Sequence, residues 1–189
     1  MTFVLASMIA AVASASPHDL VARCRAMLPE SVGLAGRIVM RNRRGVVQAE
    51  HSYDLVRTNS TTSVSVDGKR LEPPSSGVGS VMGTDVTWSD LSLEYLWWDD
   101  SSVCDESETV NGQMCSVVEM KKGDRTVRLW IDRKTGALMQ AEETKDGKAV
   151  RRLWGTRIKK FGDRWMANVM EVETIGSGHR TKITVDSLR

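Results

Sequence analysis

Alternating apolar and polar positions dominate the second half of the chain and predict a series of β-strands. The alternating runs are separated by short glycine-containing turns at residues 111–112, 122–124, 134–136, 145–147, 161–163 and 176–178. Asn-Gly and related pairs favour tight hairpins because they accept positive φ angles. The even spacing leaves no room for the long helical crossovers that parallel strands require. The pattern therefore predicts an antiparallel meander over residues 103–188, closed as a β-barrel or folded as a strongly curved sheet.

The first half of the chain shows a different pattern. Residues 18–28 carry apolar side chains at helical spacing, with Arg23 and Arg25 on the other face, and predict one amphipathic helix. We expect three strands to follow, at residues 35–41, 46–55 and 60–66. Residues 70–80 contain two prolines and two glycines and predict an exposed loop, after which residues 91–95 alternate like a strand.

The N-terminal residues resemble a secretory leader. Residues 3–15 are apolar or small, form a run too short to span a bilayer, and end in Ala13-Ser14-Ala15. We therefore expect a signal peptide at residues 1–15, a single domain at residues 16–189, and export to an oxidising compartment of the cell envelope. The usual basic residues are missing before the apolar run, and an anchored or core helix is the alternative interpretation.

Length and charge bear on the number of domains and on the kind of molecule that the protein binds. The 189 residues fit one domain, and 26 basic residues against 24 acidic ones give a net charge of +2. Charges of both signs are interspersed, which is typical of a solvated surface. This mild, mixed charge does not indicate a nucleic-acid partner.

Three cysteines, Cys24, Cys104 and Cys115, leave the disulfide pairing open. In a regular two-residue hairpin over Asn111-Gly112, Glu108 lies opposite Cys115, and Cys104 lies four residues further along the strand. At ~3.3 Å per residue that offset is about 13 Å, whereas a disulfide requires Cα atoms within about 7 Å. A Cys104–Cys115 bridge therefore requires a bulge or a longer loop.

The sequence gives little support for a catalytic site. Ser177 and His179 lie in a glycine-rich turn, and no nucleophile-elbow motif occurs. Adjacent carboxylates such as Glu142 and Glu143 point to opposite faces of a strand. Cysteines and histidines do not have metal-ligand spacing. We expect no catalytic residues, no metal site and no cofactor.

Methionine and tryptophan are abundant, with ten and six copies. Flexible methionine side chains suit a surface that accepts varied apolar ligands, and they also fill irregular cores. On the strand predicted at residues 164–174, Met166, Met170 and Val172 share one face.

Several ordered motifs resemble the LolA-like outer-membrane lipoprotein-sorting family. Met-Gly-Thr-Asp-Val-Thr-Trp-Ser-Asp-Leu at residues 82–91 is similar to the family pattern Met-Gly-Ser-Asp-Phe-Ser-Tyr-Glu-Asp-Leu. Downstream, residues 108–115, 129–138, 144–148 and 164–168 resemble the family's hairpin and strand motifs. The resemblance covers residues 80–189 well and the first half only loosely. Valine and tryptophan replace two aromatic positions of the family pattern, at Val86 and Trp88.

The resemblance implies a mainly β (α+β) fold, in which a curved antiparallel sheet forms an incomplete β-barrel covered by an N-terminal helix. It also implies a periplasmic carrier that binds acyl chains of lipoproteins in an apolar hollow and works with envelope transport proteins. We expect the hollow to be lined by Leu129, Ile131, Met139, Met166, Met170 and Val172. Carriers of this class have a functional arginine on an early strand, for which Arg37 and Arg41 are the candidates. A non-transporting sensing or assembly module of the same fold is the alternative.

Overall fold

The structure is a computed structural model that describes residues 16–58, 61–74, 79–162 and 164–189. The predicted signal peptide, residues 1–15, lies outside the described residues. So does part of the predicted loop at residues 70–80. None of the helices in the described ranges is long and apolar enough to cross a bilayer.

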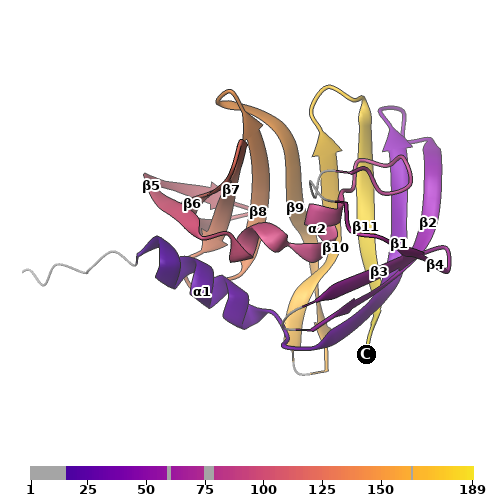
Figure 1. Cartoon of the computed structure of the whole chain (residues 1–189), viewed down its shortest axis with the longest axis horizontal. Helices are drawn as coiled ribbons and strands as arrows, with labels where there is room; N and C mark the ends of the chain where they lie inside the picture. Colours follow the sequence, from indigo (N-terminus) through magenta and orange to yellow (C-terminus); the bar gives the residue numbers. More distant parts are fainter. Residues whose placement is uncertain (1–15, 59–60, 75–78, 163) are drawn as a thin grey trace, which may run out of the picture.

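One antiparallel sheet of eleven strands forms the body of the protein, and it curves around a concave face (Figure 1). Its strands are β1 (Val32–Asn42), β2 (Val47–Arg57), β3 (Thr62–Val66), β4 (Lys69–Leu71), β5 (Asp100–Val110), β6 (Gln113–Lys122), β7 (Arg125–Asp132), β8 (Leu138–Lys145), β9 (Lys148–Phe161), β10 (Arg164–Thr174) and β11 (His179–Leu188). The turns between β5 and β11 fall at the glycine-containing pairs, where Asn111 and Asp146 have φ near +50°.

The strand order is β4-β3-β2-β1-β11-β10-β9-β8-β7-β6-β5. The first strand pairs with the last, from Leu34 opposite Leu188 to Asn42 opposite His179. The two edge strands, β4 and β5, do not pair with each other, so the sheet stays open. This arrangement confirms the expected incomplete barrel.

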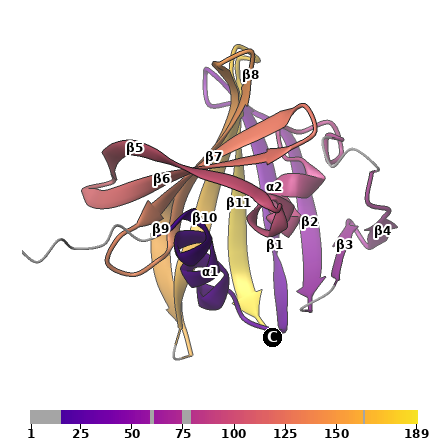
Figure 2. The same ribbon diagram turned by 60° about the vertical axis from the view of Figure 1, so that its left-hand side comes forward.

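Helix α1 (Pro17–Met27) covers part of the concave face, as expected from its apolar spacing (Figure 2). Ser16 caps it, because its hydroxyl accepts a hydrogen bond from the Asp19 amide at 3.2 Å. Its side chains Leu20, Val21 and Cys24 are buried and face the sheet.

The segment between β4 and β5 crosses the open mouth of the barrel. It contains the short helix α2 (Trp88–Ser92) and the 3-10 helix η1 (Glu94–Trp97). The expected strand at residues 91–95 is therefore wrong. Asp90 accepts a hydrogen bond from the Thr87 amide at 2.7 Å and caps α2, and Leu93 then adopts φ +52°, which breaks any extended conformation.

Gly36 lies where β1 approaches β11 too closely to leave room for a side chain. A Cβ atom at this position would lie 1.8 Å from the Thr184 carbonyl oxygen and 3.1 Å from the Tyr53 ring. The pairing register shifts between Ala35 and Gly36, which marks a bulge. Glycine at this position thus permits the bend that lets the N-terminal and C-terminal strands join.

Replacing Gly36 with alanine should therefore lower the free energy of unfolding by about 1–3 kcal/mol, because backbone atoms must move apart. The matched control is Gly155→Ala, whose added Cβ would lie 3.4 Å from Ala167 Cβ, an ordinary contact. The control should leave stability unchanged within ~0.5 kcal/mol. Urea unfolding of the two variants measures both effects, and equal losses would contradict this account of Gly36.

Candidate functional site

The candidate site is the concave face of the sheet, hereafter the hollow, together with the segments that lie over it. Apolar side chains from nearly every strand point into the hollow. Those with no exposed surface include Ile38, Val64, Val118, Leu129, Ile131, Val172 and Ile183. The alternation of each strand produces this face, because every second side chain points inward.

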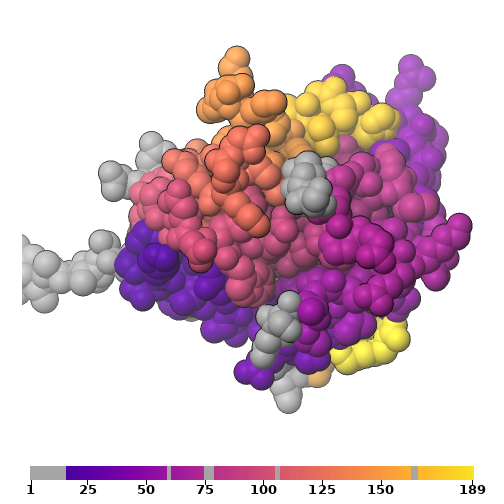
Figure 3. Space-filling view, viewed as in Figure 1, coloured from indigo at the N-terminus to yellow at the C-terminus, as the bar shows by residue number. Residues whose placement is uncertain are grey.

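Two segments fill the hollow, and we call them the cover: helix α1 and residues 81–98. Apolar side chains of the cover belong to the same buried cluster as the sheet residues; they are Leu20, Val21, Cys24, Val81, Val86, Trp88, Leu91, Tyr95, Leu96 and Trp98. On the face seen in Figure 3, atoms of α1 and of the middle of the chain close over the sheet. The protein is thus in a closed form, with its apolar surface already buried.

Three arginines of the sheet, Arg57, Arg125 and Arg151, fasten the cover, and we call them the arginine clamp. Arg57, at the end of β2, donates hydrogen bonds to the carbonyl oxygens of Leu91 at 3.2 Å and Ser92 at 2.6 Å. These carbonyls end helix α2, where a cation is stabilised by the helix dipole. Burial lowers the pKa of Arg57 from its ordinary value.

Arg125, at the start of β7, joins the cover to the neighbouring strand β8. Its guanidinium lies 3.0 Å from the Glu94 carboxylate of the cover and 3.1 Å from Glu143 of β8. It also donates to the Ser89 hydroxyl at 3.1 Å and stacks over Trp98, 5.0 Å from the ring centre. One arginine thus contacts a carboxylate, a hydroxyl and an aromatic ring around the cover.

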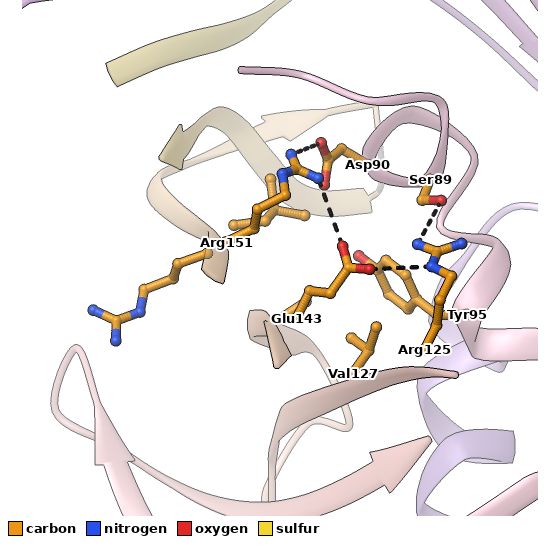
Figure 4. A pocket seen from close by; sticks show the side chains of 10 residues that line it. Ser89, Asp90, Tyr95, Arg125, Val127, Glu143 and Arg151 are labelled. Atoms are coloured by element: carbon orange, nitrogen blue, oxygen red, sulfur yellow. Dashed lines mark hydrogen bonds and ion pairs between the residues drawn. The ribbon is translucent and has the colours of Figure 1, made fainter. Parts of the chain in front are cut away.

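Arg151, on β9, makes the third attachment (Figure 4). Its guanidinium contacts Asp90 Oδ2 at 2.5 Å, the Asp85 carbonyl oxygen at 2.6 Å and the Thr87 hydroxyl at 3.1 Å. The Arg151 and Asp90 side chains are only 15% and 9% exposed. Because water screens this ion pair poorly, loss of either partner leaves an uncompensated charge and is costly.

Helix α1 is attached by a further arginine. Arg25 Nε donates to the Leu96 carbonyl oxygen at 2.5 Å, which ties α1 to the end of the crossing segment. Cys24 lies on the inner side of α1, and burial raises the pKa of its thiol to about 11. The two parts of the cover are therefore linked to each other as well as to the sheet.

The space left under the clamp is small. A cavity of about 20 Å³ lies between Ser89, Asp90 and Tyr95 of the cover and Arg125 and Arg151 of the clamp. This volume holds about one water molecule, so it cannot hold an acyl chain. Burial raises the pKa of Tyr95 far above its ordinary value, so its hydroxyl stays protonated beside these charges. An apolar ligand could enter the hollow only if the cover moved.

The structure brings together four of the six predicted lining residues. Leu129, Ile131 and Val172 are buried in the hollow, and Met170 packs against the same cluster. Met139 instead packs against a smaller cluster formed by Cys115, Val117 and Trp130, whose strand positions face the other side of the sheet. Met166 is half-buried and lies beyond the irregular pairing of β10 with β9 around Val169.

The two predicted gate arginines lie outside the clamp. Arg37 forms exposed ion pairs with Asp186 at 3.3 Å and Glu50 at 3.7 Å. Arg41 donates to the Gly45 carbonyl oxygen and lines a polar groove with His179 and Arg180. Their role as a gate stays a prediction.

The arginines of the clamp could have been found from the two-residue period of the strands. Arg125 continues the inward series Val127, Leu129, Ile131, and Arg151 precedes the inward Leu153. Arg57 continues Tyr53 and Leu55 in the same way. A charged side chain in a buried series requires a partner, and for these three the partners lie in the cover.

Of the side chains weighed for catalysis, Glu142 and Glu143 lie within β8 and pair with arginines, and Ser177 and His179 are arranged as turn residues. Ser177 Oγ accepts a hydrogen bond from the His179 backbone amide at 3.1 Å, the pattern of a polar turn. The Ser177 hydroxyl also donates to the Asp85 carboxylate at 3.4 Å, and Asp85 accepts a second hydrogen bond from the Thr181 hydroxyl at 3.0 Å. Among the described residues, no group of three or more histidine, cysteine or carboxylate side chains is placed to hold a metal ion.

Solved structures with the same fold cover nearly the whole chain. A LolA superfamily protein from Nitrosomonas europaea is 12% identical with a TM-score of 0.76, covering 93% of this chain and 94% of that one. A Vibrio parahaemolyticus domain assigned to the outer membrane lipoprotein-sorting proteins is 15% identical with a TM-score of 0.69, covering 92% of this chain and 91% of that one. A DUF1329 family protein from Desulfovibrio piger is 18% identical, TM-score 0.69, covering 93% of each chain. The chain therefore has the LolA-like fold.

Sequence comparison adds a family membership. A family model described as "Uncharacterized protein" matches residues 68–189, which is more than half of the chain, so the chain belongs to that family. The matched region begins in the turn before β4 and includes the residues 81–98 of the cover. No curated protein sequence matches the chain.

The clamp yields a prediction about stability. Replacing Arg151 with methionine should lower the free energy of unfolding by about 3–5 kcal/mol, because Asp90 loses its buried counter-ion. Amides of residues 81–98 should exchange hydrogen faster than in the original protein, since the cover opens locally. Urea unfolding and hydrogen exchange measure the two effects.

The matched control is Arg37→Met, which removes an arginine that, like both of its ion-pair partners, is at least half exposed. Its cost should stay within about 1 kcal/mol. An Arg151→Met variant as stable as the control, with unchanged exchange at residues 81–98, would refute the clamp.

Proposed function

We propose that this protein is an envelope carrier that binds acyl chains of lipoproteins or lipids in the hollow, and that it performs no catalysis. The observation that carries the proposal is the pairing of a mainly apolar concave face with a cover held by polar contacts concentrated at three arginines of that face. Apolar packing tolerates exchange of one apolar occupant for another, whereas the polar contacts define one closed position. The LolA-like fold supports the same proposal.

The energetic argument treats the cover and the ligand as competitors. An acyl chain gains about 0.8 kcal/mol for each methylene group that leaves water. The cover already occupies the hollow, so the ligand must displace it, and the work of breaking the clamp lowers the observed affinity. Leu153 and Ala141 of the buried cluster lie beside the clamp cavity, so an entering chain would meet apolar sheet surface there.

Loosening the clamp should therefore strengthen ligand binding. We expect Arg151→Met to bind a fluorescent palmitoylated peptide at least tenfold more tightly than the original protein, about 1.4 kcal/mol. Fluorescence anisotropy measures the affinity, with the same peptide lacking palmitate as the negative ligand. A damaged fold would also expose apolar surface, so the tighter binding must in addition be lost when the hollow of the same variant is made polar.

A second pair of variants tests the location of the site. Leu153→Gln places a polar group in the hollow and should weaken palmitoyl binding, whereas Ile158→Gln alters a side chain on the same strand that is 64% exposed. The Ile158 variant should bind like the original protein. If neither the original protein nor Arg151→Met binds palmitate, the carrier proposal fails and a non-transporting envelope module is favoured.

Export is the remaining part of the proposal, with lipoproteins and envelope transport proteins as the partners. Ser16 would be the first residue after cleavage at Ala15. The Ser16 amide nitrogen lies 3.3 Å from the Asp19 carboxylate, and the Ser16 hydroxyl donates to the same oxygen at 2.7 Å. A free, positively charged amino group at Ser16 would strengthen this contact with the Asp19 carboxylate.

The mature protein should therefore begin at Ser16. Expression of the full chain in a bacterium with an outer membrane, followed by fractionation and intact-mass measurement, tests this. We expect the periplasmic fraction to contain the chain without residues 1–15. Recovery of the unprocessed chain, retained in the cytoplasm, would contradict the predicted export.

A further inference from the structure

A second, smaller cluster of buried side chains lies on the face of the sheet opposite the hollow. Cys115, Val117 and Trp130 form its centre, and Cys104, Val110 and Met139 pack against it. Two of the three cysteines thus belong to one cluster. The third, Cys24, belongs to the cover and packs in the hollow.

The pairing of β5 with β6 explains why these two cysteines share a cluster. Glu108 lies opposite Cys115, as in a regular hairpin, but Cys104 lies opposite Val117. Regular pairing would place residue 106 there, so the register shift between Cys104 and Ser107 adds two residues to β5. The bulge moves Cys104 from four positions beyond Cys115 to two.

This shift changes the distance that a bridge would have to span. Residues in a diagonal position two places apart have Cα atoms about 7–8 Å apart, with shorter Cβ separations. Native disulfides join Cα atoms up to about 6.8 Å apart. The remaining difference is about 1 Å, and a bulged edge strand, paired on one side, can move by that amount.

We propose that Cys104 and Cys115 form a disulfide when the folded protein meets a disulfide donor such as oxidised glutathione or an envelope thiol oxidant. The Cys104 thiolate attacks the donor disulfide, forms a mixed disulfide and releases one donor thiol. The Cys115 thiolate then attacks the Cys104 sulfur and releases the second donor thiol. Both protein thiols lose a proton and are oxidised, while the donor disulfide is reduced to two thiols. This proposal does not depend on acyl binding.

The surroundings of the two sulfur atoms assign their order of reaction. Cys104 is half-buried and accessible to a donor, whereas Cys115 is completely buried and its Sγ lies 3.5 Å from the Gln113 carbonyl oxygen. Burial raises the pKa of the Cys115 thiol, so the second step should accelerate as the pH rises. Cys24, buried and with a pKa of about 11, should remain a thiol.

The bridge would tie an edge strand of the open sheet to its neighbour. Strand β5 is an edge strand, and α1 rests against β5, β6 and β7 on the opposite face. A covalent link between β5 and β6 would therefore hold one support of the cover in place. The odd cysteine count is then explained by one bridge and one buried thiol.

Oxidation of the folded protein under native conditions tests the proposal. The protein is incubated with oxidised glutathione at several pH values, free thiols are alkylated, and peptides are mapped by mass spectrometry. We expect a linked pair of peptides containing Cys104 and Cys115, formed faster at higher pH, and a Cys24 peptide alkylated only after unfolding. The midpoint of urea unfolding should fall when a reductant is added.

Two single variants serve as matched controls. Cys24→Ser should still form the linked pair, whereas Cys115→Ser should stop at a mixed disulfide between Cys104 and glutathione, with a urea midpoint that reductant does not lower. A stable glutathione adduct on Cys104 of the original protein, without linked peptides, would overturn the proposal. A bridge that includes Cys24 would overturn it as well.

Discussion

The position of the two sheet edges is the constraint on which the rest of the structure depends. Strands β4 and β5 follow one another in the chain, yet they lie at opposite edges of the eleven-stranded sheet. The chain between them must therefore cross the open mouth, and its apolar side chains meet the apolar concave face. Because the same chain completes the core and closes the hollow, the hollow cannot open without exposing core surface, and this links stability to access.

Charged side chains give that crossing its defined position. Apolar contacts alone specify burial but tolerate several arrangements of similar volume. Arg57, Arg125 and Arg151 approach the crossing segment from three different strands, and each meets carbonyl or carboxylate oxygens at hydrogen-bond distance. A buried ion pair adds little net stability compared with an apolar pair, and its best-supported use is to select one arrangement. The clamp is thus better suited to specifying a closed state than to maximising stability.

Much of the fold was predictable from local patterns, because strand alternation and glycine turns are encoded within a few residues. Helix α1 and the hairpins from β5 to β11 follow directly from these signals. Thr87 and Asp90 approximate a capping box, which favours the short helix α2, but the Leu91–Leu93–Tyr95 alternation wrongly predicts a strand at residues 91–95. The left-handed conformation of Leu93 there starts η1 instead. The sequence does not reveal the clamp, because an arginine within an apolar series is meaningful only when its partner is known, and those partners lie 31 to 66 residues away. Only the family resemblance points to Arg37 and Arg41, which the sheet places at exposed positions outside the clamp.

The pairing of β1 with β11 has a consequence for when the protein can fold. Arg37 and Thr184, which are 147 residues apart in the chain, lie side by side at the centre of the sheet. Neither the sheet nor the hollow can be assembled until the last strand is available, and pairings between distant segments form slowly because loop closure is entropically costly. The proposed export of the chain in an unfolded state fits such a delay. A central seam that requires both ends of the domain delays folding until the whole chain has arrived.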